Sequence, residues 1–221
     1  ISKGMHYRVE KDPAHWTVPY LPINPEDVGR TYDSDVIRIN SQSGKGGVAF
    51  VMDHYYGFKL PKVMHKELSD EIQAISERQG EVSPSQIMDK FREMYINAKY
   101  PLHFRKMRTE DISETVEGYD TKVVLTYTFK DELKTIEGFG NGPIDAVKHA
   151  LCNQGGFKTK LTMYEEHALT TGSDSQAASY IELMNSETGE RAFGVGISSN
   201  ITRSSVRAIF SAMNRLFFRK K

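Results

Sequence analysis

The residues GFGNGP, at 138–143, stand directly before a segment with helical periodicity and are suited to binding an anion. Backbone N–H groups at the start of a helix carry partial positive charge, and glycines let a ligand approach the backbone closely. A plain strand-to-helix turn explains the same residues, because glycine-rich turns are common. The pattern therefore indicates a candidate carboxylate site, and it does not name the ligand.

The other reactive residue types indicate no catalytic centre. The seven histidines include no H-x-H pair and no HExxH helix, so no metal site is predicted in this chain. Glu165, Glu166 and His167 are consecutive, but neighbouring strand residues point to opposite faces, so we interpret them as a solvated strand end. The segment SQSGKGG, at 41–47, lacks the spacing of a phosphate-binding loop and precedes an apparent strand, which indicates a hairpin turn.

Composition narrows the class of protein. The chain has 221 residues with 38% hydrophobic content, and its 29 basic and 29 acidic residues cancel, so no overall field attracts nucleic acid. Cys152 is the only cysteine, which excludes an intrachain disulfide and favours a reducing compartment, the cytoplasm. No apolar run is long enough to span a membrane, and no signal peptide is apparent. The opening residues read as the end of a helix, so we expect a piece of a longer protein.

The first hundred residues predict a connector followed by a small module. Four prolines fall in residues 13–25, so this segment should be neither helix nor central strand, yet its apolar side chains should pack on something. Residues 36–40 and 48–52 read as short strands. Residues 60–79 then predict a helix, and Ser83, Pro84 and Gln86 form a capping box that begins another.

From residue 101 onward the pattern predicts the same unit twice. Three alternating segments precede the helix at 140–151, with a tight turn at Asp131-Glu132 between the second and third. Three more precede a closing helix at 201–218. A G-x-G triplet ends the third strand of each unit, at 138–140 and 194–196. The predicted class is therefore α+β, a duplicated β-β-β-α domain preceded by a small mixed or helical subdomain. Paired units of this kind can form a ligand site at their pseudo-twofold seam.

Several blocks of this sequence resemble the 2-isopropylmalate synthases of the longer type. The segment WTVPYLPINPEDVGRTYDSDVIRINSQSGKGGVAFVM resembles the part that follows the catalytic barrel, and GFGNGPIDAVKHAL and AFGVGISSNITRSSVRAIFSAMNR resemble the regulatory domain. The resemblance implies a connector at 1–30, a linker subdomain at 31–98 and a regulatory domain at 99–221. It also implies that the metal-dependent (β/α)8 barrel, which condenses acetyl-CoA with 2-oxoisovalerate, is absent here, so this chain alone should be inactive and hold no cofactor.

The resemblance further implies the effector and its contacts. Members are inhibited by L-leucine, which lies in an interface pocket of the homodimeric regulatory domain. Tyr20 matches a tyrosine that reaches the active site of the partner subunit. The residues implied to surround leucine are Gly140, Asn141, Gly142, Ile144, Leu161, Tyr164, Ala168, Asp174, Ser175, Ala177 and Ile197. Asp145 departs from the small apolar residue that some members have at this position.

Two alternatives remain open at this stage. One is the regulatory part of a related enzyme, such as a citramalate synthase that senses isoleucine, because isoleucine has the polar groups and nearly the volume of leucine. The other is a free-standing amino-acid-binding module. The apolar VPYLPI block, at 18–23, argues against the free-standing module, since a sensor without a barrel would have no use for it.

Overall fold

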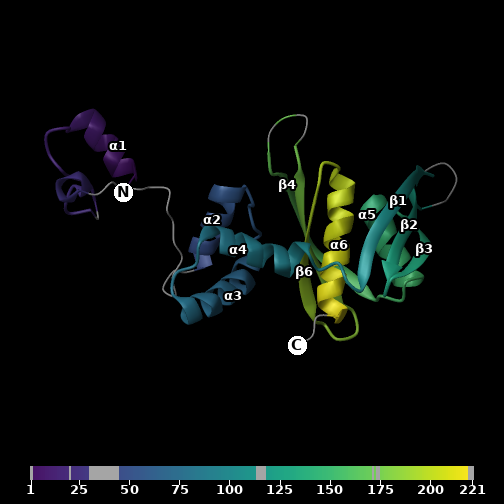
Figure 1. The fold of residues 1–221 in the computed structure, drawn as a ribbon. Helices are drawn as coiled ribbons and strands as arrows, with labels where there is room; N and C mark the ends of the chain where they lie inside the picture. The colour runs from purple at the N-terminus through teal and green to yellow at the C-terminus, as the bar shows by residue number, and fades with distance from the viewer. Residues whose placement is uncertain are drawn as a thin grey trace. The chain divides into compact units, whose positions relative to one another are not determined.

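The computed structural model describes residues 2–19, 21–29, 45–112, 118–170, 172 and 175–218. The chain divides into two units, Ile1–Arg38 and Ile39–Lys221, and each is described by itself (Figure 1). The strand predicted at 36–40 lies outside the described residues, as do residues 41–44 of the predicted turn. None of the described helices is long and apolar enough to cross a membrane.

The first unit contains the proline-rich segment, which is neither α-helix nor strand, as predicted. The segment follows α1 (Ser2–Lys11) and ends in a 3-10 turn, η1 (Pro25–Val28), where Asn24 accepts the Glu26 N–H. The Trp16 indole N–H donates to the Leu21 carbonyl at 2.6 Å, and the Arg8 guanidinium lies 4.8 Å from the Trp16 ring centroid. Val18 is buried, so part of the apolar surface expected to pack does so within this unit.

The second unit begins with a helix where a strand was predicted. Residues 48–52 belong to α2 (Lys45–Tyr56), so the predicted strand is wrong, and Lys45, Gly46 and Gly47 of the predicted turn are helical. The physical reason is the spacing of the buried residues, because Val48, Val51 and Met52 occupy one face of a helix. A run of five apolar residues does not by itself distinguish a buried helix from a strand.

The two helices predicted next are present. They are α3 (Met64–Gln79) and α4 (Pro84–Phe91), and α4 continues into a π-helical turn, η2 (Arg92–Ile96). At the start of α4 the Ser83 hydroxyl accepts the Gln86 N–H at 3.3 Å, and the Gln86 side chain accepts the Ser83 N–H at 2.9 Å. This is the predicted capping box, and it satisfies two donors that a helix start leaves unpaired.

The rest of the second unit repeats three antiparallel strands and a helix, as predicted. Figure 1 shows α6 between the two three-stranded sheets. The first repeat is β1 (Leu102–Asp111), β2 (Thr121–Phe129), β3 (Glu132–Gly140) and α5 (Pro143–Asn153), and the second is β4 (Thr159–Ala168), β5 (Ala177–Asn185), β6 (Arg191–Ser198) and α6 (Ile201–Phe218).

A single hydrophobic core joins the two repeats. Leu125 of β2, Ile181 of β5 and Val206 of α6 belong to the same buried cluster. The Phe210 ring lies 5.6 Å from the ring of Tyr127, so α6 packs against the first repeat as well as its own sheet. The β2–β3 turn uses Lys130 and Asp131, both with positive φ, one residue before the predicted position.

The G-x-G triplets set how closely each helix approaches its sheet. A Cβ at Gly138 would lie 2.3 Å from the Ala146 carbonyl oxygen, and one at Gly194 would lie 2.2 Å from the Ala208 carbonyl oxygen. Gly140 and Gly196 face the helix backbone in the same way. At Gly140 the space beside the Cα is filled by α5, and its contact with a ligand stays a prediction.

The C-terminal half of α6 also holds the helical subdomain. Buried Asn214 accepts the Leu102 N–H at 2.9 Å and donates to the carbonyls of Leu102 and Ala98. Arg215 pairs with Glu67 of α3, and its guanidinium lies 4.3 Å from the Tyr95 ring centroid. Because one helix packs on both sheets and on this subdomain, a change at either sheet can reach the helices that precede it.

Candidate functional site

Four of the predicted residues of the second repeat lie on one face of its sheet. Ser179 of β5 bonds to Ser204 and Ser205 of α6, which identifies the helix-facing side. Residues directly opposite on neighbouring strands share a face, and side chains along a strand alternate. The register therefore puts four predicted residues on that side: Leu161, Tyr164, Ala168 and Ala177.

The edge strand β4 leaves part of this face open. Helix α6 packs over β5 and β6, whereas Tyr164 of β4 remains 40% exposed and Ala168 is exposed. The Tyr164 hydroxyl lies 3.0 Å from the Ser205 hydroxyl and also donates to Glu166. Partial burial raises the pKa of Tyr164, and the hydrogen bond to Glu166 raises it further. The phenol stays protonated and serves as a fixed donor.

A cavity of about 260 Å³ opens at the end of this strand. Its apolar members include Ala168, Ala177 and Ile201, and Glu166 supplies a carboxylate. Ile201 is 53% exposed, which leaves an apolar surface beside a negative charge. The complete lining is Glu166, His167, Ala168, Ser175, Ala177, Ser199 and Ile201. This combination suits an ammonium group next to a short hydrocarbon chain.

The start of α6 is partly occupied by its own cap. The Asn200 side chain accepts the Arg203 N–H at 2.8 Å, so the helix caps itself at this end. The Ser175 hydroxyl is also occupied, since it donates to the Thr170 carbonyl. The cavity therefore supplies groups for the ammonium and the hydrocarbon part, and of its possible donors to a carboxylate the Ser175 hydroxyl and one N–H of α6 are already paired.

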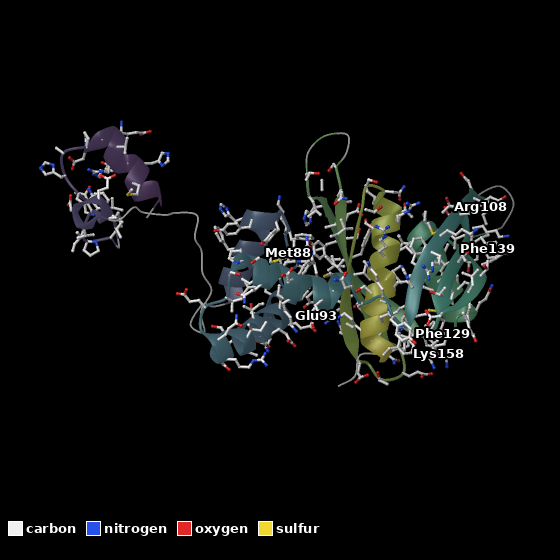
Figure 2. The ribbon with its side chains drawn as sticks, in the orientation of Figure 1. Met88, Glu93, Arg108, Phe129, Phe139 and Lys158 are labelled. Carbon is white, nitrogen blue, oxygen red and sulfur yellow. The ribbon has the colours of Figure 1, made fainter. Side chains whose placement is uncertain are left out.

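The predicted residues of the first repeat form a turn at the start of α5. Figure 2 places Phe139, the last residue before this turn, at the same end of the first repeat as Arg108. Gly142 has no atom within 4 Å of an added Cβ, and its φ of 178° is extended backbone that other residues adopt. Ile144 is half-buried and packs against the core. The turn therefore presents an open surface at Asn141 and Gly142.

Asp145 occupies part of the expected anion site. Its carboxylate accepts the Asn141 N–H at 3.2 Å and lies 3.8 Å from the Lys148 amine and 3.6 Å from a His149 ring nitrogen. The first turn of a helix still leaves N–H groups without intrahelical acceptors, and Pro143 removes one of them. The remaining donors at this helix start are able to bind a carboxylate that approaches from outside.

The structure does not bring all the predicted residues together within one chain. The turn at 140–142 belongs to the first repeat, and Figure 1 shows α6 between it and β4. Ile197 pairs with Ala178 on the opposite face of the second sheet, away from Tyr164 and Ala168. Tyr20 and Asp174 lie outside the described residues.

Sequence reasoning missed four lining residues, Glu166, His167, Ser199 and Ile201, and misjudged the surroundings of one of them. His167 is half-buried rather than solvated. Its Nε2 lies 3.0 Å from the Gly57 carbonyl and 3.3 Å from the Lys59 amide nitrogen, and its ring stacks on Tyr180. The alternation Tyr164, Glu166, Ala168 was the available signal, because residues two apart on a strand share a face.

The described residues thus form an α+β module with a cavity beside β4 in the second repeat and an open turn before α5 in the first. The family described as "LeuA allosteric (dimerisation) domain" matches residues 81–217. The family described as "Alpha-isopropylmalate synthase, post-catalytic domain-like" matches residues 1–53. Since the first match covers more than half of the chain, this chain belongs to the LeuA allosteric (dimerisation) domain family.

Individual relatives agree with this assignment. The chain is 40% identical to a 2-isopropylmalate synthase of Helicobacter hepaticus over 221 residues, which is 98% of this chain and 39% of the relative. It is 42% identical to that of Clostridium acetobutylicum, with 97% and 38% covered, and 43% identical to that of Mycobacterium leprae, with 97% and 36% covered. The chain therefore spans between about a third and two fifths of the length of these curated relatives.

Proposed function

We propose that this chain is the regulatory, leucine-binding and dimerising part of a 2-isopropylmalate synthase. The observation that carries the proposal is the division of the site. The β4 cavity supplies a carboxylate and an apolar surface, and the α5 turn supplies backbone N–H donors. Together they match the ammonium, side chain and carboxylate of one amino acid.

A second copy of the chain completes the site. Because α6 separates the two half-sites within a chain, the α5 turn of one protomer meets the β4 cavity of its partner, with one leucine between them. Such a ligand links the two protomers, and its binding favours one arrangement of the dimer over others. His167 transmits the change in dimer arrangement to the helical subdomain. It lies beside Ala168 in the cavity and contacts the loop at 57–59.

In the whole enzyme this arrangement serves feedback inhibition. The barrel, with its divalent metal, condenses acetyl-CoA with 2-oxoisovalerate, and Tyr20 contributes to the active site of the partner subunit. Leucine, the end product, binds between the two protomers of the regulatory dimer and lowers the activity of the barrel. The chain described by this sequence has no turnover of its own.

A heterodimer experiment tests the division of the site between protomers. Gly142→Val blocks the turn without straining the backbone, because its φ is extended and the surrounding space is open. Ala168→Phe blocks the cavity from an exposed position on β4. Each homodimer should lose leucine binding, measured by calorimetric titration, since both of its sites contain one damaged half.

The heterodimer of one Gly142→Val chain and one Ala168→Phe chain, purified with two different tags, should bind one leucine. One of its sites is assembled from two damaged halves and the other from two intact halves. A heterodimer that binds no leucine would show that both halves come from the same chain. If both homodimers bind leucine as tightly as the parent does, the leucine site does not include Gly142 or Ala168.

A further inference from the structure

A second cavity, of about 310 Å³, lies where the helical subdomain meets the second repeat. Its walls come from the segment after η2, the start of β1, the edge strand β6 and the middle of α6. None of the residues predicted for leucine lines it except Ile197, which faces away from the β4 cavity. The lining is Ile96, Ala98, Lys99, Leu102, His103, Phe104, Arg105, Val195, Gly196, Ile197, Arg203, Arg207, Phe210 and Ser211.

The cavity is lined by an unusual number of basic side chains for a chain whose net charge is zero. They are Lys99, His103, Arg105, Arg203 and Arg207, and the lining contains no aspartate or glutamate. Among the described residues, no carboxylate forms an ion pair with these lysine and arginine side chains. Four permanent positive charges thus surround one concave surface without a negative partner.

The pKa of His103 is lowered in part by the same positive charges. Burial lowers the pKa of His103, and the nearby charges of Arg105, Lys99 and Arg207 lower it further. The Arg207 guanidinium also donates to the Ile197 carbonyl, which holds this side chain against β6. An arginine fixed in this way loses less conformational entropy when it binds an anion.

The floor of the cavity is apolar. Leu102, Val195 and Phe210 are buried and line the cavity together with the exposed Arg203 and Arg207 of α6. A cationic rim over an apolar floor matches a ligand with the reverse character, an anion attached to a hydrocarbon or ring. The volume is large enough for a small organic molecule and too small for a folded partner's surface to enter.

Leucine does not fit this cavity chemically. Its ammonium group needs carbonyl or carboxylate oxygens, and the ring of basic side chains repels it. The β4 cavity has Glu166 for that purpose, whereas the basic cavity has no acidic side chain. The two cavities are therefore built for ligands of different charge.

We propose that the basic cavity binds a small organic anion that carries two or more negative charges beside an apolar body. Dicarboxylates and phosphate esters share this chemistry, and arginine pairs bind either one through two parallel hydrogen bonds. Arg203 and Arg207 lie one turn apart on α6, so both guanidinium groups are able to reach the same ligand.

The experiment titrates the 221-residue chain with two probes at low salt, 2-isopropylmalate as the dicarboxylate and inorganic pyrophosphate as the phosphate. The dicarboxylate probe is chosen from the proposed function, but the site itself does not depend on that function. Saturable binding of either probe in calorimetry is expected, and the tighter probe identifies the class. The His103 ring signal in NMR should move, and its pKa should rise, because a bound anion favours the imidazolium.

The double variant Arg203→Gln with Arg207→Gln should weaken binding at least tenfold. The double variant Lys134→Gln with Lys160→Gln removes the same charge from exposed strand positions and should change binding less than threefold. Leucine titration of both variants should match the parent, which separates this proposal from the regulatory one. Absence of saturable binding by both probes at millimolar concentration, or equal losses in the two double variants, overturns the proposal.

Discussion

Replacing Gly194 with alanine should destabilise the duplicated domain sharply. A Cβ at this position would lie 2.2 Å from the Ala208 carbonyl oxygen and 2.3 Å from the Ala212 amide nitrogen, and contacts under 3.0 Å essentially never occur. Helix α6 would have to move away from β6 by roughly 0.8 Å, although it packs on both sheets. Both opposing atoms are backbone atoms, so no side-chain rotation relieves the contact.

Overpacking of this kind costs about 1–3 kcal/mol, and we expect the upper end because the obstacle is a helix backbone. For a chain of this size a loss of about 3 kcal/mol lowers Tm by roughly 6–12 °C. Thermal unfolding followed by circular dichroism at 222 nm measures the loss. Gly142→Ala is the matched control, since an added Cβ meets no atom within 4 Å and φ is extended. A Gly194→Ala chain as stable as the control would refute the close approach of α6 to β6.

Three further substitutions test other parts of the structure. Asn214→Ala should cost about 1–3 kcal/mol in chemical unfolding, because the Leu102 amide would be left buried without its partner; an unchanged midpoint would contradict the hydrogen bonds described. Arg215→Met should lower the free energy of unfolding by about 1.5–3 kcal/mol, and the loss is reduced because half-exposed Glu67 regains hydration. A variant of equal stability would show that this ion pair is not stabilising. His103 has a folded-state pKa below 6.5, so the unfolded chain binds more protons in the window between these values. Stability should rise with pH through that window, and His103→Gln should flatten the rise; an unaltered slope would exclude His103 as its source.

Periodicity predicted most of the regular structure because several elements bury mainly one face. Buried and exposed residues alternate in β3, and α6 carries Val206, Ile209, Phe210 and Met213 at helical spacing, whereas β5 and β6 contain runs of consecutive buried residues. The capping box at Ser83 was predictable for a local reason, since its two hydrogen bonds join residues three apart. The strand prediction for residues 48–52 was wrong because a short apolar run fits a buried helix and a strand equally well.

The candidate site was harder to predict than the fold, because its residues come from distant elements. The close approach of α5 to Gly140 was not predicted, since the sequence does not reveal that this helix passes within contact distance of it. Glu166 and Ile201 were missed because the cavity brings together the end of β4 and the start of α6. The basic cavity likewise joins residues 96–105 with 195–211, a pairing that depends on the tertiary structure.

Calorimetric titration of the purified chain with leucine, isoleucine and valine tests the regulatory account most directly. The account predicts one leucine bound per protomer of a dimer, with weaker binding of isoleucine and valine. A hundredfold excess of leucine over its Kd should also stabilise the chain by about 2.7 kcal/mol. The absence of binding heat with millimolar leucine, together with identical melting curves, would contradict it, and tighter binding of isoleucine would assign the module to a different effector.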